Sequence, residues 1–157
     1  VNSSGQVAFS AVFSKVINNI TNTTRGIMIA NRPSTFADWA WRAKLPVGQD
    51  GPGDDANGDG VPNIMAYYFG YNGTDVLNQA DLVRWNWNGA AIEVEFDHDA
   101  TVTDVVAEIK ITGALGGSWN PGPALNVVNS SGTTETLRAT IAAEGEQGFA
   151  KLVLSMP

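Results

Sequence analysis

The sequence predicts a mainly β protein: an antiparallel β-sandwich that carries a small helix–loop–helix insert and an N-terminal strand arm. Several short runs alternate apolar with polar residues, which is the period of a half-buried strand. Turns rich in Gly, Asn and Ser separate these runs at the spacing of a sandwich. One intervening stretch instead places its apolar residues at helical spacing, beside a loop rich in Asp, Asn and Gly.

The expected organisation is one globular domain preceded by an arm. We assign residues 1–33 to the N-terminal β arm, residues 34–79 to the insert and residues 80–157 to the strands of the sandwich. A chain of 157 residues with 43% hydrophobic residues is large enough to bury one core.

The arm opens with the alternation of a strand. Its apolar positions fall on every second residue, namely Val7, Phe9, Ala11 and Phe13. A polar stretch over residues 18–24 follows, and we expect a second short strand near residues 26–30. The first strand can pair within its own subunit or add to the open sheet of another copy. We expect residues 7–16 to add to an adjacent copy, because no Pro protects them, and head-to-tail addition propagates as a filament.

The insert is expected to contain two short helices. Thr35 and Asp38 form a start that resembles a capping box, and Leu45-Pro46 ends the first helix. The second helix is expected over residues 63–69, and Gly70 suits its C-terminal cap.

The last part of the chain contains six strand-like runs. In the run over residues 91–97, apolar side chains are expected to face inward and acidic side chains outward. Asn88-Gly89 is a strong signal for a tight hairpin turn. The expected strands cover residues 82–88, 91–97, 105–112, 125–129, 134–141 and 149–155.

The loop between the two expected helices has the spacing of a calcium site. Ca²⁺ takes roughly six to eight oxygen ligands, and a tight loop turns alternate residues toward one ion. Gly60 stands at the sixth position, where the chain turns sharply, and Val61 would offer its backbone carbonyl. The predicted side-chain ligands are Asp55, Asn57, Asp59 and Asn63. An acidic surface turn without a metal is the alternative.

One ligand of the full pattern is missing. The twelfth loop position, which is usually a bidentate Glu, is Ala66. A water molecule or another carboxylate would have to replace it, and the nearby candidates are Asp50, Asp54 and Asp75.

The composition narrows the classes of partner and the compartment. A net charge of −7 without a basic cluster argues against nucleic acid or an anionic membrane surface as a partner. No apolar run approaches the roughly 18 residues of a membrane span. The absence of Cys excludes a disulfide framework, so bound Ca²⁺ is the available means of making loops rigid. A low charged fraction of 16% with 17 Gly, and a first residue that is not Met, lead us to expect a processed extracellular or cell-surface protein.

Two blocks of the sequence carry a family resemblance. The first reads FADW, LP, GPGDD and GDGVPNIMAYYFG over residues 36–39, 45–46, 51–55 and 58–70. The second comprises residues 107–109, 118–119 and 149–152. Together they resemble a module near the C-termini of secreted proteins of Verrucomicrobia and Planctomycetes, which are bacteria. The module's loop is similar to those of dockerins and thrombospondin type-3 repeats.

The resemblance covers about residues 36–157 and implies a secreted Ca²⁺-binding β-module without catalysis. It implies the same four side-chain ligands, Asp55, Asn57, Asp59 and Asn63. The chain departs from the family pattern where Ala66 replaces a Glu and where Asn57 replaces an Asp, so the loop has lost negative charge.

Three other features have competing interpretations. Trp85 and Trp87 lie on one side of a strand, where they would either pack in the core beneath the helix or form a platform for sugar rings. Glu93 and Glu95 have roughly the separation of a glycosidase pair, but alternating Glu on a solvent face is ordinary. His98 is interpreted as a solvated turn residue.

We therefore expect a non-catalytic, Ca²⁺-binding structural subunit that assembles with itself into extracellular filaments. The alternative function is a carbohydrate-binding module of a polysaccharide-degrading enzyme. A third and weaker candidate is an enzyme that uses Glu93 and Glu95.

Overall fold

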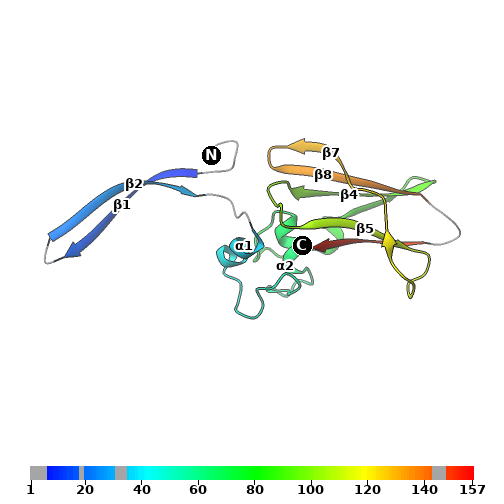
Figure 1. Ribbon diagram of the computed structural model, residues 1–157, viewed down its shortest axis with the longest axis horizontal. Helices are drawn as coiled ribbons and strands as arrows, with labels where there is room; N and C mark the ends of the chain where they lie inside the picture. Colours follow the sequence, from blue (N-terminus) through cyan, green and yellow to red (C-terminus); the bar gives the residue numbers. More distant parts are fainter. Residues whose placement is uncertain (1–6, 18–19, 31–34, 143–147) are drawn as a thin grey trace. The chain divides into compact units, whose positions relative to one another are not determined.

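The computed structural model describes residues 7–17, 20–30, 35–142 and 148–157 (Figure 1). The chain divides into two compact units, Val1–Pro33 and Ser34–Pro157. The fold is mainly β, as the sequence predicts. The second unit has two antiparallel sheets, of four and three strands, and its described helices are short.

The first unit is a hairpin. β1 (Val7–Ile17) pairs antiparallel with β2 (Ile20–Ala30), so that Val7 lies opposite Ala30 and Ile17 opposite Ile20. The first strand is confirmed. The second begins at Ile20, earlier than expected, because the stretch predicted as a polar link is rich in Thr, whose branched side chain favours extended backbone.

The second unit contains all six strands that the alternation predicts. One sheet has the order β3-β4-β8-β7, and these strands cover Arg84–Trp87, Ala91–Asp99, Thr134–Ala142 and Asn126–Ser131. The other has the order β6-β5-β9, and its strands cover Asn120–Pro121, Val106–Thr112 and Phe149–Ser155. The two-residue β6 was not predicted, since so short a segment carries no periodicity.

The inner faces of the two sheets form the core. On β4, Val94 and Phe96 are fully buried, while Asp97 is exposed, which confirms the predicted inward and outward faces. Ile109 of β5 and Leu137 of β8 complete the contact between the layers.

Three helices join this core. α1 (Phe36–Ala43) begins at Thr35, whose hydroxyl accepts from the backbone N–H of Asp38 at 3.2 Å, as predicted. α2 (Asn63–Tyr68) also matches its expected range. α3 (Gln79–Leu82) was not predicted, because its single turn is too short for helical periodicity. No helix among the described residues is long and apolar enough to cross a membrane.

An aromatic cluster fastens α1 to α2. The rings of Phe36, Trp39 and Tyr67 lie within 5.5 to 5.7 Å of one another. Asp104 accepts from the Phe36 N–H at 2.8 Å and from the Tyr67 hydroxyl at 2.7 Å. Burial and the adjacent Asp104 carboxylate both raise the pKa of Tyr67, so this hydroxyl remains protonated and acts as a donor. The loop between α1 and α2 is thereby held at both ends.

Two sequence-based interpretations of polar and aromatic residues were wrong. His98 is not a solvated turn residue: it lies on β4, is only 9% exposed and stacks on Tyr68. Trp85 and Trp87 are not core residues, since they are 45% and 57% exposed. Of the two Trp residues on the helix that was expected to cover them, Trp39 packs against Phe36 and Tyr67, and Trp41 is 81% exposed.

Candidate metal site

Asp55 organises the first half of the loop. Its Oδ1 accepts from the backbone N–H of Gly58 at 2.8 Å and from that of Asp59 at 3.2 Å, and its Oδ2 accepts from Gly60 at 2.8 Å. Gly58 and Gly60 have φ of 74° and 85°, which is the left-handed region where Gly is favoured. The predicted sharp turn at Gly60 is confirmed, and the positive φ is its reason, because a Cβ there would meet no atom within 4 Å. The chain therefore wraps around one carboxylate.

Asp59 links this wrapped loop to two other segments. Its Oδ1 accepts from the Val61 N–H at 2.8 Å, and its Oδ2 accepts from the Leu77 N–H at 2.7 Å. Burial raises the pKa of Asp59, but the donated hydrogen bonds from Leu77 and Val61 outweigh it, so the pKa lies below its ordinary value. The side chain of Val61 is buried in the core, and it anchors the loop there.

Asn57 contacts a segment that is distant in sequence. Its Nδ2 donates to the backbone carbonyl of Asp75 at 2.6 Å and to Asp59 Oδ2 at 3.1 Å. Its Oδ1 accepts from the Asp59 N–H at 3.2 Å. The segment around Asp75 and Leu77 therefore closes one side of the loop. The sequence indicates Asp75 as one of three candidate carboxylates, but it does not predict that this segment contacts the loop.

Asn63 holds the loop together from inside. It is only 3% exposed, and its Nδ2 donates to the carbonyls of Gln49 and Gly51, both at 2.9 Å. Its Oδ1 accepts from the Ala56 N–H at 3.3 Å. An amide oxygen has two lone pairs, so Oδ1 keeps one acceptor position for an ion or a water molecule.

The missing twelfth ligand has a structural reason. Ala66 is buried in the core, so a long acidic side chain at this position would have to be accommodated among apolar neighbours. Asp50 and Asp54 accept from the N–H groups of Gly48 and Gly51 and thus shape local turns. Of the three proposed replacements, Asp75 is the one whose backbone bonds to a predicted ligand side chain.

The donor atoms of these residues are of the type that a hard cation binds. Carboxylate, amide and carbonyl oxygens are the ligands that Ca²⁺ takes, and Asp55, Asn57 and Asp59 supply them within one turn of chain. In the described part of the chain, no three His, Asp or Glu side chains gather at one point, so amide and backbone oxygens would have to contribute. Neither Asp55 nor Asp59 has an ion pair with Lys or Arg among the described residues.

One of the two carboxylates considered for catalysis, Glu95, is held in an ion-pair network. Glu95 accepts from Arg138 Nε at 2.8 Å and from Arg84 at 2.9 Å. These two bonds lower the pKa of Glu95, which therefore remains ionised and is poorly suited to be a general acid. Glu93 accepts from the Asn88 side chain at 3.3 Å.

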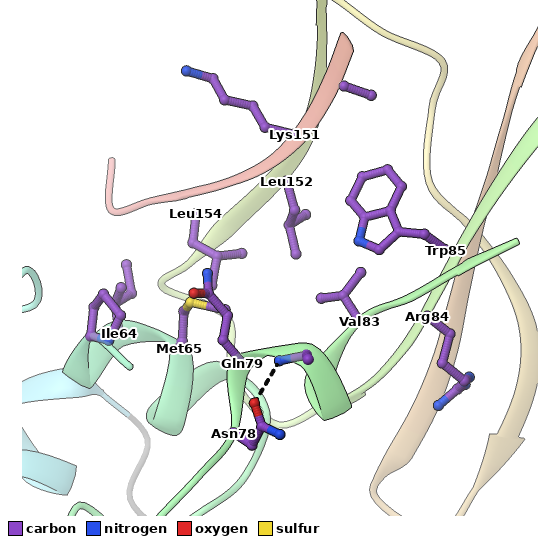
Figure 2. A pocket seen from close by; sticks show the side chains of 13 residues that line it. Ile64, Met65, Asn78, Gln79, Val83, Arg84, Trp85, Lys151, Leu152 and Leu154 are labelled. Atoms are coloured by element: carbon purple, nitrogen blue, oxygen red, sulfur yellow. Dashed lines mark hydrogen bonds between the residues drawn. The ribbon is translucent and has the colours of Figure 1, made fainter. Parts of the chain in front are cut away.

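An open groove of about 1140 Å³ borders the two sheets (Figure 2). Val83 and Trp85 line one wall, and Leu152 and Leu154 of β9 line the other. Met65 of α2 lines the groove as well. The groove was not predicted, because no local pattern shows where two sheets diverge. Trp87 is not among its lining residues.

The structure places the predicted assembly residues on one strand. β1 contains all four of them, Val7, Phe9, Ala11 and Phe13, and β2 is its partner in the described sheet.

No family model, curated protein or solved structure matches the chain in the three comparisons with known proteins.

Proposed function

We propose that the protein is a non-catalytic extracellular or cell-surface module, stabilised by one Ca²⁺, that assembles with copies of itself through its N-terminal hairpin. The main support for this proposal comes from the loop. Asp55 and Asp59 each accept hydrogen bonds from two or more backbone N–H groups. Neither carboxylate has a cationic side chain as its partner among the described residues. A divalent cation is the counter-charge that such a loop accommodates.

Asp75 is proposed as the replacement for the missing Glu. Its carbonyl already bonds to Asn57, and its side chain accepts from the Asn72 N–H at 2.8 Å. A small rearrangement of that turn would offer one more oxygen to the ion. The role of the ion is structural, because the loop joins α1 to α2 and leads into the core at Val61.

Chelation tests the metal. Ca²⁺ that binds only the folded state contributes about 2.7 kcal/mol at a hundredfold excess over Kd. We expect the Tm of the native protein to fall when a chelator is added and to recover with Ca²⁺. Asp59→Ala should lower Tm even without metal, since Val61 and Leu77 lose an acceptor. The informative quantity is therefore the difference between Ca²⁺-loaded and chelated protein.

That difference should vanish in Asp59→Ala and persist in a matched control, Asp81→Ala, which removes an exposed carboxylate from α3. The metal proposal fails if chelation leaves the native Tm unchanged in protein that has been saturated with Ca²⁺. Asp75→Asn should weaken Ca²⁺ binding and leave the Tm of the chelated protein nearly unchanged.

The size of the intact chain tests assembly. We expect light scattering and electron microscopy to find polymers at high protein concentration with Ca²⁺ present. Deletion of residues 1–16 should give a soluble species that does not polymerise. A monodisperse species of the chain mass, 16.6 kDa, would contradict the assembly part of the proposal.

A carbohydrate-binding function is the second candidate, and the exposure of Trp85 in the groove favours it. An exposed aromatic ring beside polar side chains is a suitable platform for a sugar ring. Saturable binding on a glycan array that is lost in Trp85→Ala, with the melting curve unchanged, would support this candidate. Trp41→Ala is the control, because Trp41 is exposed but lies outside the groove.

A further inference from the structure

The groove of Figure 2 lies between two strand edges that have no partner among the described strands. β3 is at the end of the order β3-β4-β8-β7, and β9 is at the end of the order β6-β5-β9. Residues from the beginning of β3 and from the middle of β9 line the groove. A strand placed there would meet unpaired backbone groups along β9.

The free edge of β9 is poorly protected. β9 (Phe149–Ser155) contains Lys151 as its one charged residue and no Pro. Edge strands that must stay unpaired are normally protected by charged residues, by a Pro or by a bulge, and Lys151 is the one such residue in β9. The apolar residues beside this edge are only partly buried, among them Met65, Leu152 and Leu154. Both backbone and side chains on this side of the sandwich can therefore accept another strand.

The same chain carries a strand that belongs to a sheet of two strands. β1 and β2 form a sheet of two strands within their own compact unit, and a two-stranded ribbon is at best marginally stable in water. β1 has one charged residue, Lys15, and no Pro, and Phe9 and Phe13 belong to its alternating apolar positions in the sequence. Such a strand gains stability by adding to a sheet and covering an apolar surface.

The charges of the two units are complementary. Residues 1–33 carry Lys15, Arg25 and Arg32 and no Asp or Glu, so their formal charge is +3. Because the whole chain has a charge of −7, residues 34–157 carry −10. Attraction between the hairpin of one copy and the sandwich of another raises their rate of encounter.

The groove itself does not oppose this pairing. Its two cations are Arg84 and Lys151. Arg84 is paired with Glu95 at 2.9 Å, and Lys151 lies 4.3 Å from the ring centre of Trp119, at the groove's rim. Most of the other lining residues are apolar, and Asn78 and Gln79 are polar but uncharged. The contact would therefore be mainly between apolar side chains, and the charge difference between the units acts over a longer range.

We propose that the groove between β3 and β9 is the acceptor site for the hairpin of a second copy, with β1 pairing to the free edge of β9. The sheet would then have the order β6-β5-β9-β1-β2, and the face of β1 that carries Phe9 and Phe13 would cover the groove. β1 keeps β2 as its partner, so the hairpin does not open. This inference rests on the assembly part of the proposed function and adds the acceptor to it.

Because the native chain has no Cys, single cysteines report the contact directly. One copy carries an affinity tag and Ser10→Cys, the position that follows Phe9 in β1. A second, untagged copy carries Lys151→Cys, which is exposed on β9. A short bifunctional thiol reagent is added to an equal mixture with Ca²⁺. The control copy carries Ser130→Cys, which is exposed on β7, at the far edge of the other sheet.

We expect a cross-link between tagged and untagged chains for the pair at positions 10 and 151, and at least about tenfold less for the pair at positions 10 and 130. Phe9→Glu in the tagged copy should lower the yield by a similar factor. This second variant changes only the hairpin unit, so loss of the cross-link does not arise from an unfolded sandwich. Leu152→Glu in the acceptor copy should act in the same way, with its folding verified by circular dichroism.

Several results would overturn the inference, and they differ in whether they also contradict the proposed self-assembly. Polymers that cross-link through position 130 instead of 151 would remove the groove as acceptor but leave self-assembly in place. A third chain that carries both Ser10→Cys and Lys151→Cys is treated alone, and a cross-link found only within single copies of it would assign the groove to the protein's own hairpin. A monomer without cross-links would remove both proposals, and binding of a glycan that Trp85→Ala abolishes would then identify a sugar as the occupant.

Discussion

His98 occupies a buried position that charge and sequence context did not indicate. Its ring stacks on Tyr68, with centroids 4.8 Å apart and an interplanar angle of 17°. Its Nε2 lies 3.6 Å from Glu135, while Nδ1 is buried and has no hydrogen-bond partner among the described residues. Burial and the nearby Glu135 raise the pKa of Tyr68 to about 12. Because Nδ1 lacks a partner and the ring is stacked, the polar atoms of His98 contribute less to stability than its ring does.

His98→Phe is expected to retain or increase the free energy of unfolding, by up to about 1–2 kcal/mol. The substitution keeps a flat ring against Tyr68 and removes a buried nitrogen that lacks a partner. Urea unfolding at neutral pH measures the change. His98→Asn is the matched control, because it keeps a polar group and loses the ring, so it should destabilise. A strongly destabilised His98→Phe would show that the contact with Glu135 outweighs the cost of burying Nδ1.

At the scale of elements, the candidate metal loop depends on the backbone conformation of Gly60. Both Gly60 and Gly53 have open space where a Cβ would stand, but only Gly60 has a positive φ, of 85°. Gly60→Ala should therefore cost roughly 1–2 kcal/mol and weaken Ca²⁺ binding, since non-Gly residues are strained in this region. Gly53→Ala should be nearly neutral. Thermal melts with and without Ca²⁺ test this pair, and equal effects of the two substitutions would contradict it.

Across the four-stranded sheet, Glu95 of β4 ties Arg84 of β3 to Arg138 of β8. The two arginines lower the pKa of Glu95 in the folded state. A lowered folded-state pKa contributes stability above the unfolded pKa, and this contribution is lost as the pH falls through the folded value.

Glu95→Gln should thus lower the free energy of unfolding by about 0.5–1 kcal/mol at neutral pH, a modest amount because the group is partly exposed. On acidification, this variant should lose less of its free energy of unfolding than the native protein does. Glu93→Gln, on the same strand face, is the control and should leave the pH dependence unchanged. Chemical unfolding at several pH values between neutral and acidic provides the measurement. An unchanged pH dependence in Glu95→Gln would show that the arginines do not stabilise its ionised form.

At the scale of the whole molecule, the chain divides into two compact units, and Ser34–Pro157 is one of them. The core residues found among the described side chains, from Phe36 to Leu154, form a hydrophobic cluster within that unit. The sandwich should therefore fold without residues 1–33, with a Tm within a few degrees of that of the full chain and the same response to chelation. Calorimetry on the two chains compares them. A broadened or much lower transition in the truncated chain would show that the hairpin is part of the sandwich's own fold.

Most elements could be predicted because their signals are local. The alternation around Val94 and Phe96 identifies both the strand and its buried face, since side chains on a strand alternate between two sides. Thr35 marks the start of α1, because its hydroxyl satisfies an N–H group that the helix leaves free. α3 and β6 were missed because neither is long enough to show a period.

The contacts of the candidate metal loop could be predicted only in part from the sequence. The spacing of Asp55, Asn57 and Asp59 is local, and so is the turn at Gly60. The approach of Asp75 and Leu77 depends on how the chain returns after α2, which no pattern in the loop determines. Asn63 was predicted as a ligand, and the structure adds that its amide also joins the loop to Gln49 and Gly51.

The sequence by itself determined the β-sandwich class, the strand faces, the start of α1 at Thr35 and the sharp turn at Gly60, because each follows from the conformational preferences of a few consecutive residues. Only the tertiary structure decided which faces are covered. Trp85 pairs with Val94 across two strands and shares its side of the sheet, yet Val94 is fully buried and Trp85 is 45% exposed. The difference arises because Trp85 lies on the edge strand β3, beside the open groove. Burial depends on what packs against a residue, and this depends on segments far away in the chain.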